Sequence, residues 1–323
     1  LEAMFTFMNT ARIGTAFQGL ASAELSYQGS LPYAKERRSM RALSGKKEAE
    51  QVADALIWHP DVRRMLLTQK AIAEGARCMI YDAAKIADHL FNAVEAGDSK
   101  AFKRHENELG FFTPVLKGFL TELGLEAANL GVQVFGGHGY IGEHGMEQIV
   151  RDARISTLYE GTTGIQALDL LGRKVLLSSK GKCVRDYTLQ MVQFAKSKVL
   201  KRTRLGSMAR SLSLRAAEWN ALTMAIMLRA RKDREVVGAA SFDYLMYSGY
   251  VMMAFSWAQQ AAKARELLDS GTGKESAEFY KAKIQTAEFY FDRLLPRANA
   301  HRAGALASTK SLMQMNKDHF NFA

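Results

Sequence analysis

Apolar side chains recur at intervals of three and four residues along most of the chain, which is the spacing of amphipathic helices. The pattern is strongest from Pro60 to Ala96, where the proline suits a first helical turn and Gly97 suits the end. Its apolar positions include Val62, Met65, Leu66, Ile72, Ala76, Met79, Ile80, Ala83 and Leu90. A looser pattern predicts a helix over residues 3–30, followed by Pro32 and a basic, irregular stretch.

The same spacing predicts helices over residues 113–134 and 164–177, with a glycine cluster and a short segment from Met146 to Arg154 between them. Residues 178–182 have the composition of a linker. Beyond it, further amphipathic helices are predicted at about 185–205, 208–232, 240–269 and 275–299. We therefore expect an all-α protein, with a bundle of three or four antiparallel helices in residues 1–178 and a second helical domain in residues 179–323.

Composition supports helices and narrows the class of protein. Only four prolines occur, and unbranched side chains that favour helix are abundant. No uncharged apolar stretch reaches about 18 residues, so we expect no membrane span. Two cysteines are too few for a disulfide framework, which favours a reduced, cytoplasmic protein. The chain opens on Leu1 with neither an initiator methionine nor a cap, so we expect a fragment of a longer protein.

The formal net charge of +11 allows nucleic acid, anionic lipid or a phosphorylated ligand as partner. The basic residues are spread along predicted helices and mixed with acidic ones. Even the densest stretch, residues 196–210, is typical of a solvated helix face. No nucleic-acid-binding module is recognisable, and we expect no nucleic-acid partner.

Two short patterns suggest sites that the surrounding sequence argues against. Residues 137–142 match G-x-G-x-x-G, but a dinucleotide site needs a strand before the glycines, and the preceding residues are helical in pattern. His138, Glu143 and His144 lie close together without the spacing of a known metal motif. We therefore expect neither a Rossmann fold nor a metal site.

Three other segments suggest chemistry. Residues 133–140 (QVFGGHGY) place glycines at a helix end, where backbone N–H groups can approach a ligand. In residues 151–154 (RDAR), Asp152 is positioned to hold an arginine by a bidentate pair. In residues 158–166 (LYEGTTGIQ), Glu160 lies just before a helix that Thr162 or Thr163 can cap. Each segment also has an ordinary reading: a helix cap, an ion pair and a solvated loop carboxylate.

Together, in this order and spacing, the three segments resemble the C-terminal half of the acyl-CoA dehydrogenases. The resemblance covers roughly residues 4–178. Upstream, residues 9–12 (NTAR) resemble the family's CoA-contacting segment, and residues 36–39 (ERRS) resemble the segment that contacts FAD across a dimer. Residues 59–70 (HPDVRRMLLTQK) resemble a larger bacterial subfamily that carries an extra C-terminal helical domain, which includes the 3-methylmercaptopropionyl-CoA dehydrogenases.

The resemblance implies α,β-dehydrogenation of an acyl-CoA thioester to the trans-2-enoyl-CoA. Glu160 would be the base that removes the α-proton, and its backbone N–H would help to stabilise the enolate oxygen. Residues in FAD-contacting positions are Arg37, Ser39, Gln133, Gly136, Gly137, Thr162, Thr163 and Gly164. Residues in substrate-contacting positions are Asn9, Arg12, Tyr159 and Gly161. The implied electron acceptor is electron-transfer flavoprotein, and the implied assembly is a homodimer or a dimer of dimers.

The sequence departs from the family pattern in several places. The loop after Arg37 lacks the usual Phe-Gly, and Gly164 stands where many members carry glutamine. The family's preceding helical domain and β-domain have no counterpart in the chain, so we expect the chain alone to be inactive and colourless. An acyl-CoA oxidase on the same fold and a non-catalytic helical assembly domain are the alternatives. For residues 179–323 we expect packing against the bundle or a dimer partner, with contact to a membrane or to CoA phosphates as the alternative.

Overall fold

The computed structural model describes the backbone of residues 2–200 and 202–321, and within those ranges the side chains from residue 9 onward. These residues form helices and turns, and the one β-contact among them is an isolated bridge between Arg38 and Ala55. The prediction of an all-α fold is confirmed. No helix in the described ranges is long and apolar enough to cross a membrane.

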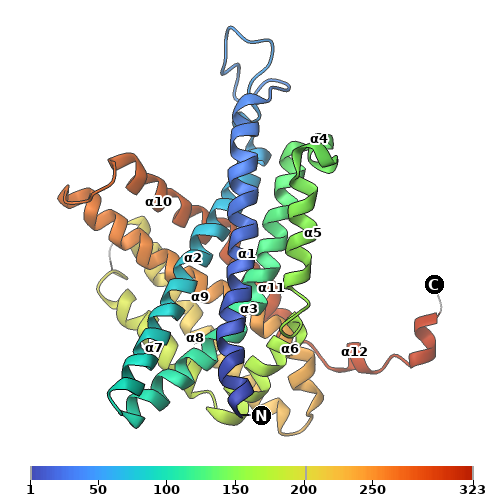
Figure 1. Cartoon of the computed structure of the whole chain (residues 1–323), viewed down its shortest axis with the longest axis vertical. Coiled ribbons are helices and arrows are strands. Elements are labelled where there is room, and N and C mark those ends of the chain that lie inside the picture. Colours follow the sequence, from blue (N-terminus) through green and yellow to red (C-terminus); the bar gives the residue numbers. More distant parts are fainter. Residues whose placement is uncertain (1, 201, 322–323) are drawn as a thin grey trace.

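Three long helices and one short helix make up the first bundle (Figure 1). They are α1 (Glu2–Glu36), α2 (Pro60–Glu95), α3 (Ser99–Phe135) and α5 (Met146–Ser156). Helices α1 and α3 approach closely at Gly19 and Gly124. A Cβ atom on Gly19 would lie 2.3 Å from the carbonyl oxygen of Leu120, and one on Gly124 would lie 2.4 Å from the carbonyl oxygen of Gly19. Only glycine leaves room for this backbone contact.

Helix α1 continues through Pro32, where the sequence predicted its end. Proline removes one helical hydrogen bond, and the packing of the residues that follow Pro32 compensates for that loss. Ala34 is fully buried, and the ring of Tyr33 stacks on Phe135 with centroids 4.0 Å apart. Helix α3 likewise begins earlier than predicted, because Asp98 caps it by accepting from the N–H groups of Lys100 and Ala101.

The loop between α1 and α2 is organised around the buried carboxylate of Asp54. It accepts from the backbone N–H groups of Ala42, Lys47 and Glu48 at 2.9, 3.0 and 2.8 Å, and from Arg41 at 3.2 Å. Those backbone hydrogen bonds, with that of Ala42 first, hold the pKa of Asp54 far below its usual range. A short helix, η1 (Leu56–Trp58), then leads into α2.

The remaining elements follow in chain order. They are α4 (Gly137–Tyr140), η2 (Gly142–His144), α6 (Thr163–Leu168), the π-helix η3 (Asp169–Ser178), α7 (Lys182–Lys196), α8 (Arg204–Ala230), α9 (Glu235–Ser270), α10 (Ala277–Phe289), η4 (Tyr290–Leu294), η5 (Leu295–Arg297), α11 (Ala298–Ala305), α12 (Lys310–Met313) and η6 (Lys317–Asn321). The segment with α12 and η6 extends away from the other helices (Figure 1).

The second half of the chain packs directly on the first. Indole Nε1 of Trp257 on α9 donates to the carbonyl oxygen of Ala71 on α2 at 3.1 Å, and both side chains are buried. Gly249 on α9 lies against the ring of Phe119 on α3. One continuous apolar cluster includes residues from both sides of Ser178. The predicted linker is a tight turn, in which Lys180 and Gly181 have φ of +49° and +79°.

Candidate active site

Glu160 lies in a tight loop that joins α5 to α6. Glu160 and Gly161 have φ of +56° and +87°, so two successive residues adopt the left-handed conformation. Glycine adopts it freely, but in glutamate it costs roughly 1–2 kcal/mol. Other contacts must therefore hold Glu160 in this geometry.

Two buried side chains hold the carbonyl groups of the loop. Nε2 of Gln166 donates to the carbonyl oxygen of Glu160 at 2.8 Å and lies 3.4 Å from that of Gly161. Nζ of Lys117 on α3 donates to the carbonyl oxygen of Gly161 at 2.6 Å. Thr162 caps α6, and its hydroxyl accepts from the N–H of Ile165, which confirms one of the two predicted caps. The carbonyls thus face the protein interior.

Lys117 is fully buried in the middle of α3. Burial lowers the pKa of its amine to about 8; the carboxylates of Glu122 and Glu160 act against this, and Arg12 adds to it. Glu122 itself accepts a hydrogen bond from the hydroxyl of Thr163 at 2.6 Å. Lys117 was not among the site residues predicted from the sequence. The sequence feature that indicates its burial is a lysine within the mostly apolar segment of residues 114–120 (PVLKGFL).

The outward side of the loop is open. The side chain of Glu160 is exposed. Within the described part of the chain, the backbone N–H groups of Glu160 and Gly161 have no hydrogen-bond acceptor. The N–H of Gly161 belongs to the same peptide as the held carbonyl of Glu160, so it points away from Gln166 and is available to a ligand. In such an arrangement the carboxylate can accept a proton, and the N–H donors can stabilise a developing oxyanion.

Arg12, a predicted substrate-contacting residue, lies near Lys117 and is tied to the protein. Arg12 is 3% exposed and forms an ion pair with Asp169 at 2.6 Å. Asp169 also pairs with Arg173 at 2.5 Å. Burial raises the pKa of the Asp169 carboxyl, but the two arginines together lower it below its usual value. Nε of Arg12 is buried and has no partner in the described chain.

Asn9 and Tyr159, two further substrate-contacting candidates, are also held in place. The side-chain oxygen of Asn9 accepts from the hydroxyl of Thr113 on α3 at 3.1 Å. The hydroxyl of Tyr159 donates to the side-chain oxygen of Gln18 on α1. These bonds connect α1 with α3 and with the loop that carries Glu160.

The residues predicted to contact FAD form two separate groups. Gln133, Gly136 and Gly137 are exposed where α3 ends, beside Tyr33 at the end of α1. Arg37 and Ser39, both exposed, follow Tyr33 at that same end. A Cβ atom on Gly136 or Gly137 would meet nothing within 4 Å, so this end is open to a ligand.

The second group is Thr162, Thr163 and Gly164, at the other end of α5. The 11 residues of α5 separate the two groups by roughly 16 Å at about 1.5 Å per residue. Thr162 and Gly164 are exposed, whereas Thr163 is buried and its hydroxyl is bonded to Glu122. The backbone N–H of Thr163 donates to the carbonyl oxygen of Thr157 at 3.2 Å, so both its side chain and its N–H are committed to the protein.

One predicted contact is wrong. Asp152 accepts from Nε2 of Gln148 at 2.7 Å and makes no ion pair with an arginine in the part of the chain described. Gln148 and Asp152 both lie on the exposed face of α5. Residues four positions apart are neighbours on a helix surface, so Gln148 is within hydrogen-bonding reach of Asp152. Among the described residues there is also no cluster of side chains that could hold a metal ion.

The chain matches two protein-family models and a curated protein. A family model described as acyl-CoA dehydrogenase, C-terminal domain, matches residues 1–176, and one described as acetyl-CoA dehydrogenase C-terminal like matches residues 188–316. The chain is 36% identical over 317 residues to 3-methylmercaptopropionyl-CoA dehydrogenase of Ruegeria pomeroyi, covering 97% of this chain and 51% of that protein.

Solved structures share the fold. An acyl-CoA dehydrogenase complexed with FAD from Bacillus anthracis matches with a TM-score of 0.69 and 18% identity, over 98% of this chain and 51% of that one. An acyl-CoA oxidase from Yarrowia lipolytica matches with a TM-score of 0.69 and 14% identity, over 94% and 46%. The chain thus spans about half the length of the proteins that it matches.

Proposed function

Since this chain belongs to the acyl-CoA dehydrogenase family, as its sequence predicted, we propose that it is the C-terminal portion of an FAD-dependent acyl-CoA dehydrogenase with Glu160 as base. The observation that carries the proposal is the loop geometry. An exposed carboxylate lies beside two backbone N–H groups that have no acceptor among the described residues, and Lys117 and Gln166 hold the carbonyl groups of the same loop. Removal of a proton next to a thioester carbonyl requires such a base and such hydrogen-bond donors.

The α-proton of a thioester is weakly acidic, so its removal requires stabilisation of the negative charge on the carbonyl oxygen. Glu160 accepts the α-proton on its carboxylate, and its own N–H donates to that oxygen. FAD, when bound, supplies the acceptor for the β-hydrogen, which leaves as hydride. Apolar side chains exposed around the loop offer a surface for the acyl chain. They are Phe17, Ile155, Leu158 and Ile165, between 43% and 54% exposed.

The two groups of FAD residues fit one cofactor on each side of a dimer. Thr162 and Gly164 would hold the cofactor whose ring faces Glu160, and Thr163 between them would fix this turn through its bonds to Thr157 and Glu122. Gln133, Gly136, Gly137, Arg37 and Ser39, at the other end of α5, would reach the cofactor of a second subunit, as the resemblance to the family implies. A homodimer is therefore part of the proposal.

For Arg12 we propose a positioning role beside the CoA thioester rather than an exposed contact. Its Nη1 is held by Asp169, and its Nε is buried without a hydrogen-bond partner in the described chain. Asn9, Tyr159 and Gly161 would line the path of the substrate. Acyl-CoA is the substrate class, and electron-transfer flavoprotein is the proposed acceptor of the electrons.

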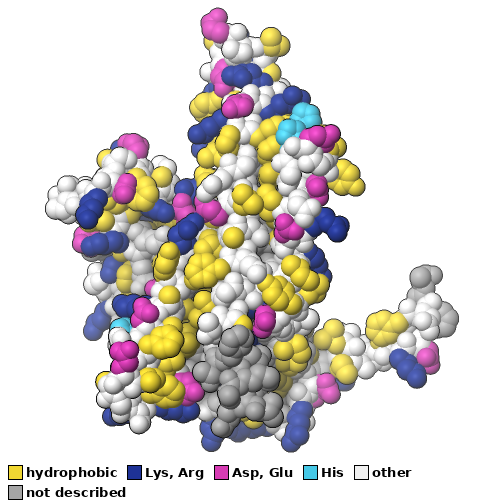
Figure 2. All heavy atoms as spheres, in the orientation of Figure 1, with side chains coloured by type: hydrophobic (Ala, Val, Ile, Leu, Met, Phe, Trp, Pro, Cys, Tyr) yellow, Lys and Arg dark blue, Asp and Glu magenta, His cyan; other side chains and the backbone are white. Residues whose placement is uncertain are grey.

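Glu160 and the apolar side chains around its loop are exposed in this chain. Hydrophobic side chains reach the surface at several places on the face shown in Figure 2. We propose that a preceding portion of the protein covers it, as the greater length of the relatives suggests. Purified alone, the 323-residue chain should lack a flavin spectrum.

An acyl-CoA oxidase is the second candidate, since an oxidase shares the fold with an equal TM-score. The relative with the higher sequence identity is a dehydrogenase, which favours that activity. The full-length enzyme should convert acyl-CoA to enoyl-CoA with electron-transfer flavoprotein as acceptor and form no stoichiometric peroxide in air. Peroxide formation that matches product formation would identify an oxidase.

A further inference from the structure

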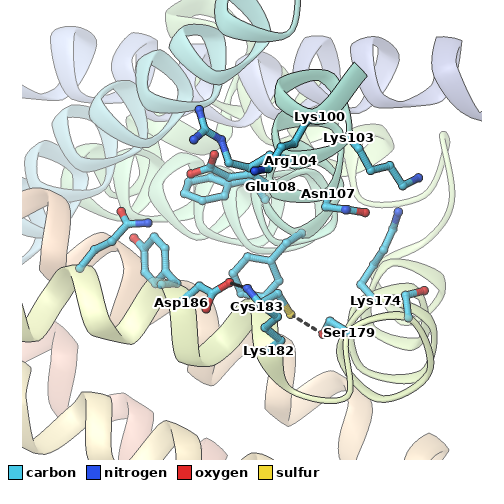
Figure 3. Close-up of a pocket in the computed structure, with 15 residues that line it drawn as sticks. Lys100, Lys103, Arg104, Asn107, Glu108, Lys174, Ser179, Lys182, Cys183 and Asp186 are labelled. Carbon is cyan, nitrogen blue, oxygen red and sulfur yellow. Dashed lines mark hydrogen bonds and ion pairs between the residues drawn. The ribbon is translucent and has the colours of Figure 1, made fainter. Parts of the chain in front are cut away.

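A hollow of about 660 Å³ lies between the start of α3 and the turn that joins η3 to α7 (Figure 3). Its volume falls within the usual range for sites that bind small molecules. Its floor is aromatic: Phe111 and Phe112 from α3 meet Tyr187 from α7, with ring centroids 5.5 to 6.2 Å apart. The lining includes neither Glu160 nor Lys117, so the hollow is not the candidate active site.

The rim of the hollow is basic, and its cations are only partly neutralised. Lys103 pairs with Glu106 at 2.9 Å, and Lys182 pairs with Asp186. Three further cations, Lys100, Arg104 and Lys174, have no carboxylate within ion-pair distance in the described ranges. The one other acid in the lining, Glu108, lies 3.5 Å from the ring of His105. The hollow therefore carries an excess of positive charge.

Lys174 is the least typical of these cations, because it is half-buried. Burial first, and then the neighbouring Arg173, lower the pKa of its amine. Its side chain lies along α3 in space left by Gly110, where a Cβ atom would be 2.8 Å from its Nζ. Figure 3 shows it reaching from η3 across the hollow toward Asn107 and Lys103. An anion placed there would offset the cost of burying this charge.

We propose that this hollow binds an organic phosphate, a phosphate monoester that carries an apolar group. A phosphate monoester bears about −1.5 to −2 charges and three acceptor oxygens. That matches three unneutralised cations better than a carboxylate does. The amide of Asn107 and the hydroxyl of Ser179 are further donors at the hollow. The apolar group of the ligand would pack on the aromatic floor. A bare inorganic anion would make no use of that floor.

Phenyl phosphate is the probe that tests the charge and the apolar group together. Trp219 reports binding, since its ring centroid lies 6.1 Å from that of Phe111 and 5.9 Å from that of Tyr187. Titration of the 323-residue chain should give saturable quenching and a matching calorimetric isotherm. Benzoate should bind at least tenfold more weakly. Benzoate binding as tightly as phenyl phosphate, or no saturable binding of phenyl phosphate, overturns the proposal.

Two variants locate the site at Lys174. Lys174→Met keeps the aliphatic stem and should weaken phenyl phosphate binding about tenfold, the loss of one charge-assisted hydrogen bond. Gly110→Ala should weaken it too, by displacing the ammonium group while favouring helix. Lys232→Met removes an equal charge from an exposed position outside the hollow and serves as control. Equal weakening by Lys232→Met, or full binding by both test variants, overturns the site.

The phosphate monoester is either the 3′-phosphate of CoA or part of a separate small molecule. Competition of CoA and of dephospho-CoA, which lacks the 3′-phosphate, with bound phenyl phosphate distinguishes these two sources. Displacement by CoA alone identifies the 3′-phosphate of the proposed substrate's carrier. Displacement by neither identifies a separate small phosphate. Displacement by both with equal strength shows that the monoester is not recognised and overturns the proposal. All these measurements concern binding to this chain, so they are independent of the activity proposed for Glu160.

Discussion

Nζ of Lys117 lies 2.6 Å from the carbonyl oxygen of Gly161, the residue that follows the proposed base. A buried ammonium group on α3 thereby fixes the backbone of a loop in which two successive residues have positive φ. Lys117 touches neither substrate nor reacting atoms in this account. It is a positioning residue, and its effect on Glu160 passes through the backbone between them.

Replacing Lys117 by methionine should lower kcat of the full-length enzyme by on the order of 10²-fold, because small misplacements of reacting groups cost about that much. The variant should be less stable by about 1–3 kcal/mol, because the buried carbonyl of Gly161 loses its charged donor, so the melt must show that it is folded. Steady-state kinetics and a thermal melt measure both. An unchanged KM with reduced kcat supports positioning, whereas wild-type kcat in a folded variant contradicts it.

The pH dependence of turnover offers a separate test of Lys117. Its pKa is lowered to about 8, so the amine carries its proton below that pH and loses it above. The neutral amine is a weaker donor to the Gly161 carbonyl. We expect kcat of the wild-type enzyme to fall as pH rises through about 8, and kcat of Lys117→Met to lack this transition. The same transition in both enzymes would assign it to another group.

The buried ion pair between Arg12 and Asp169 should matter for stability. Asp169→Asn leaves Arg12 without its partner, which typically costs about 3–5 kcal/mol when the charge is buried. The pKa of Asp169 is lowered in the folded chain, so its contribution is present above the unfolded value, near 4, and is lost as pH falls below it. Denaturant unfolding near neutral pH and at acidic pH measures this. An equal difference between wild type and variant at both pH values would contradict it.

Much of the fold was predictable from the sequence, because helical spacing of apolar residues and capping residues are local signals. Thr162 as a cap and Pro60 as a first-turn residue are examples. The end predicted at Pro32 was wrong, because the stacking of Tyr33 on Phe135 depends on residues 102 positions apart. Lys117 and the partner of Arg12 were missed for the same reason. The position of Glu160 was predictable, but the contacts that hold its loop were not.

The close contact of α1 and α3 provides a matched pair of variants on one helix. Gly19→Ala places a Cβ atom 2.3 Å from the carbonyl oxygen of Leu120, and such overpacking typically costs about 1–3 kcal/mol. Gly14→Ala meets nothing within 4 Å and should stabilise α1 by up to about 1 kcal/mol. Urea denaturation of the two variants should move the midpoint in opposite directions. Equal shifts would mean that the backbone contact at Gly19 is not tight.

The most direct test of the central claim is the rate of flavin reduction by an acyl-CoA in the full-length Glu160→Gln enzyme. Glutamine keeps the shape and the backbone N–H but cannot accept the α-proton, so the rate should fall by about 10²- to 10⁴-fold. Glu143→Gln, a change at an exposed glutamate in η2, is the control and should reduce flavin at the wild-type rate. Flavin reduction by Glu160→Gln at the rate of that control would contradict the assignment of Glu160 as the base.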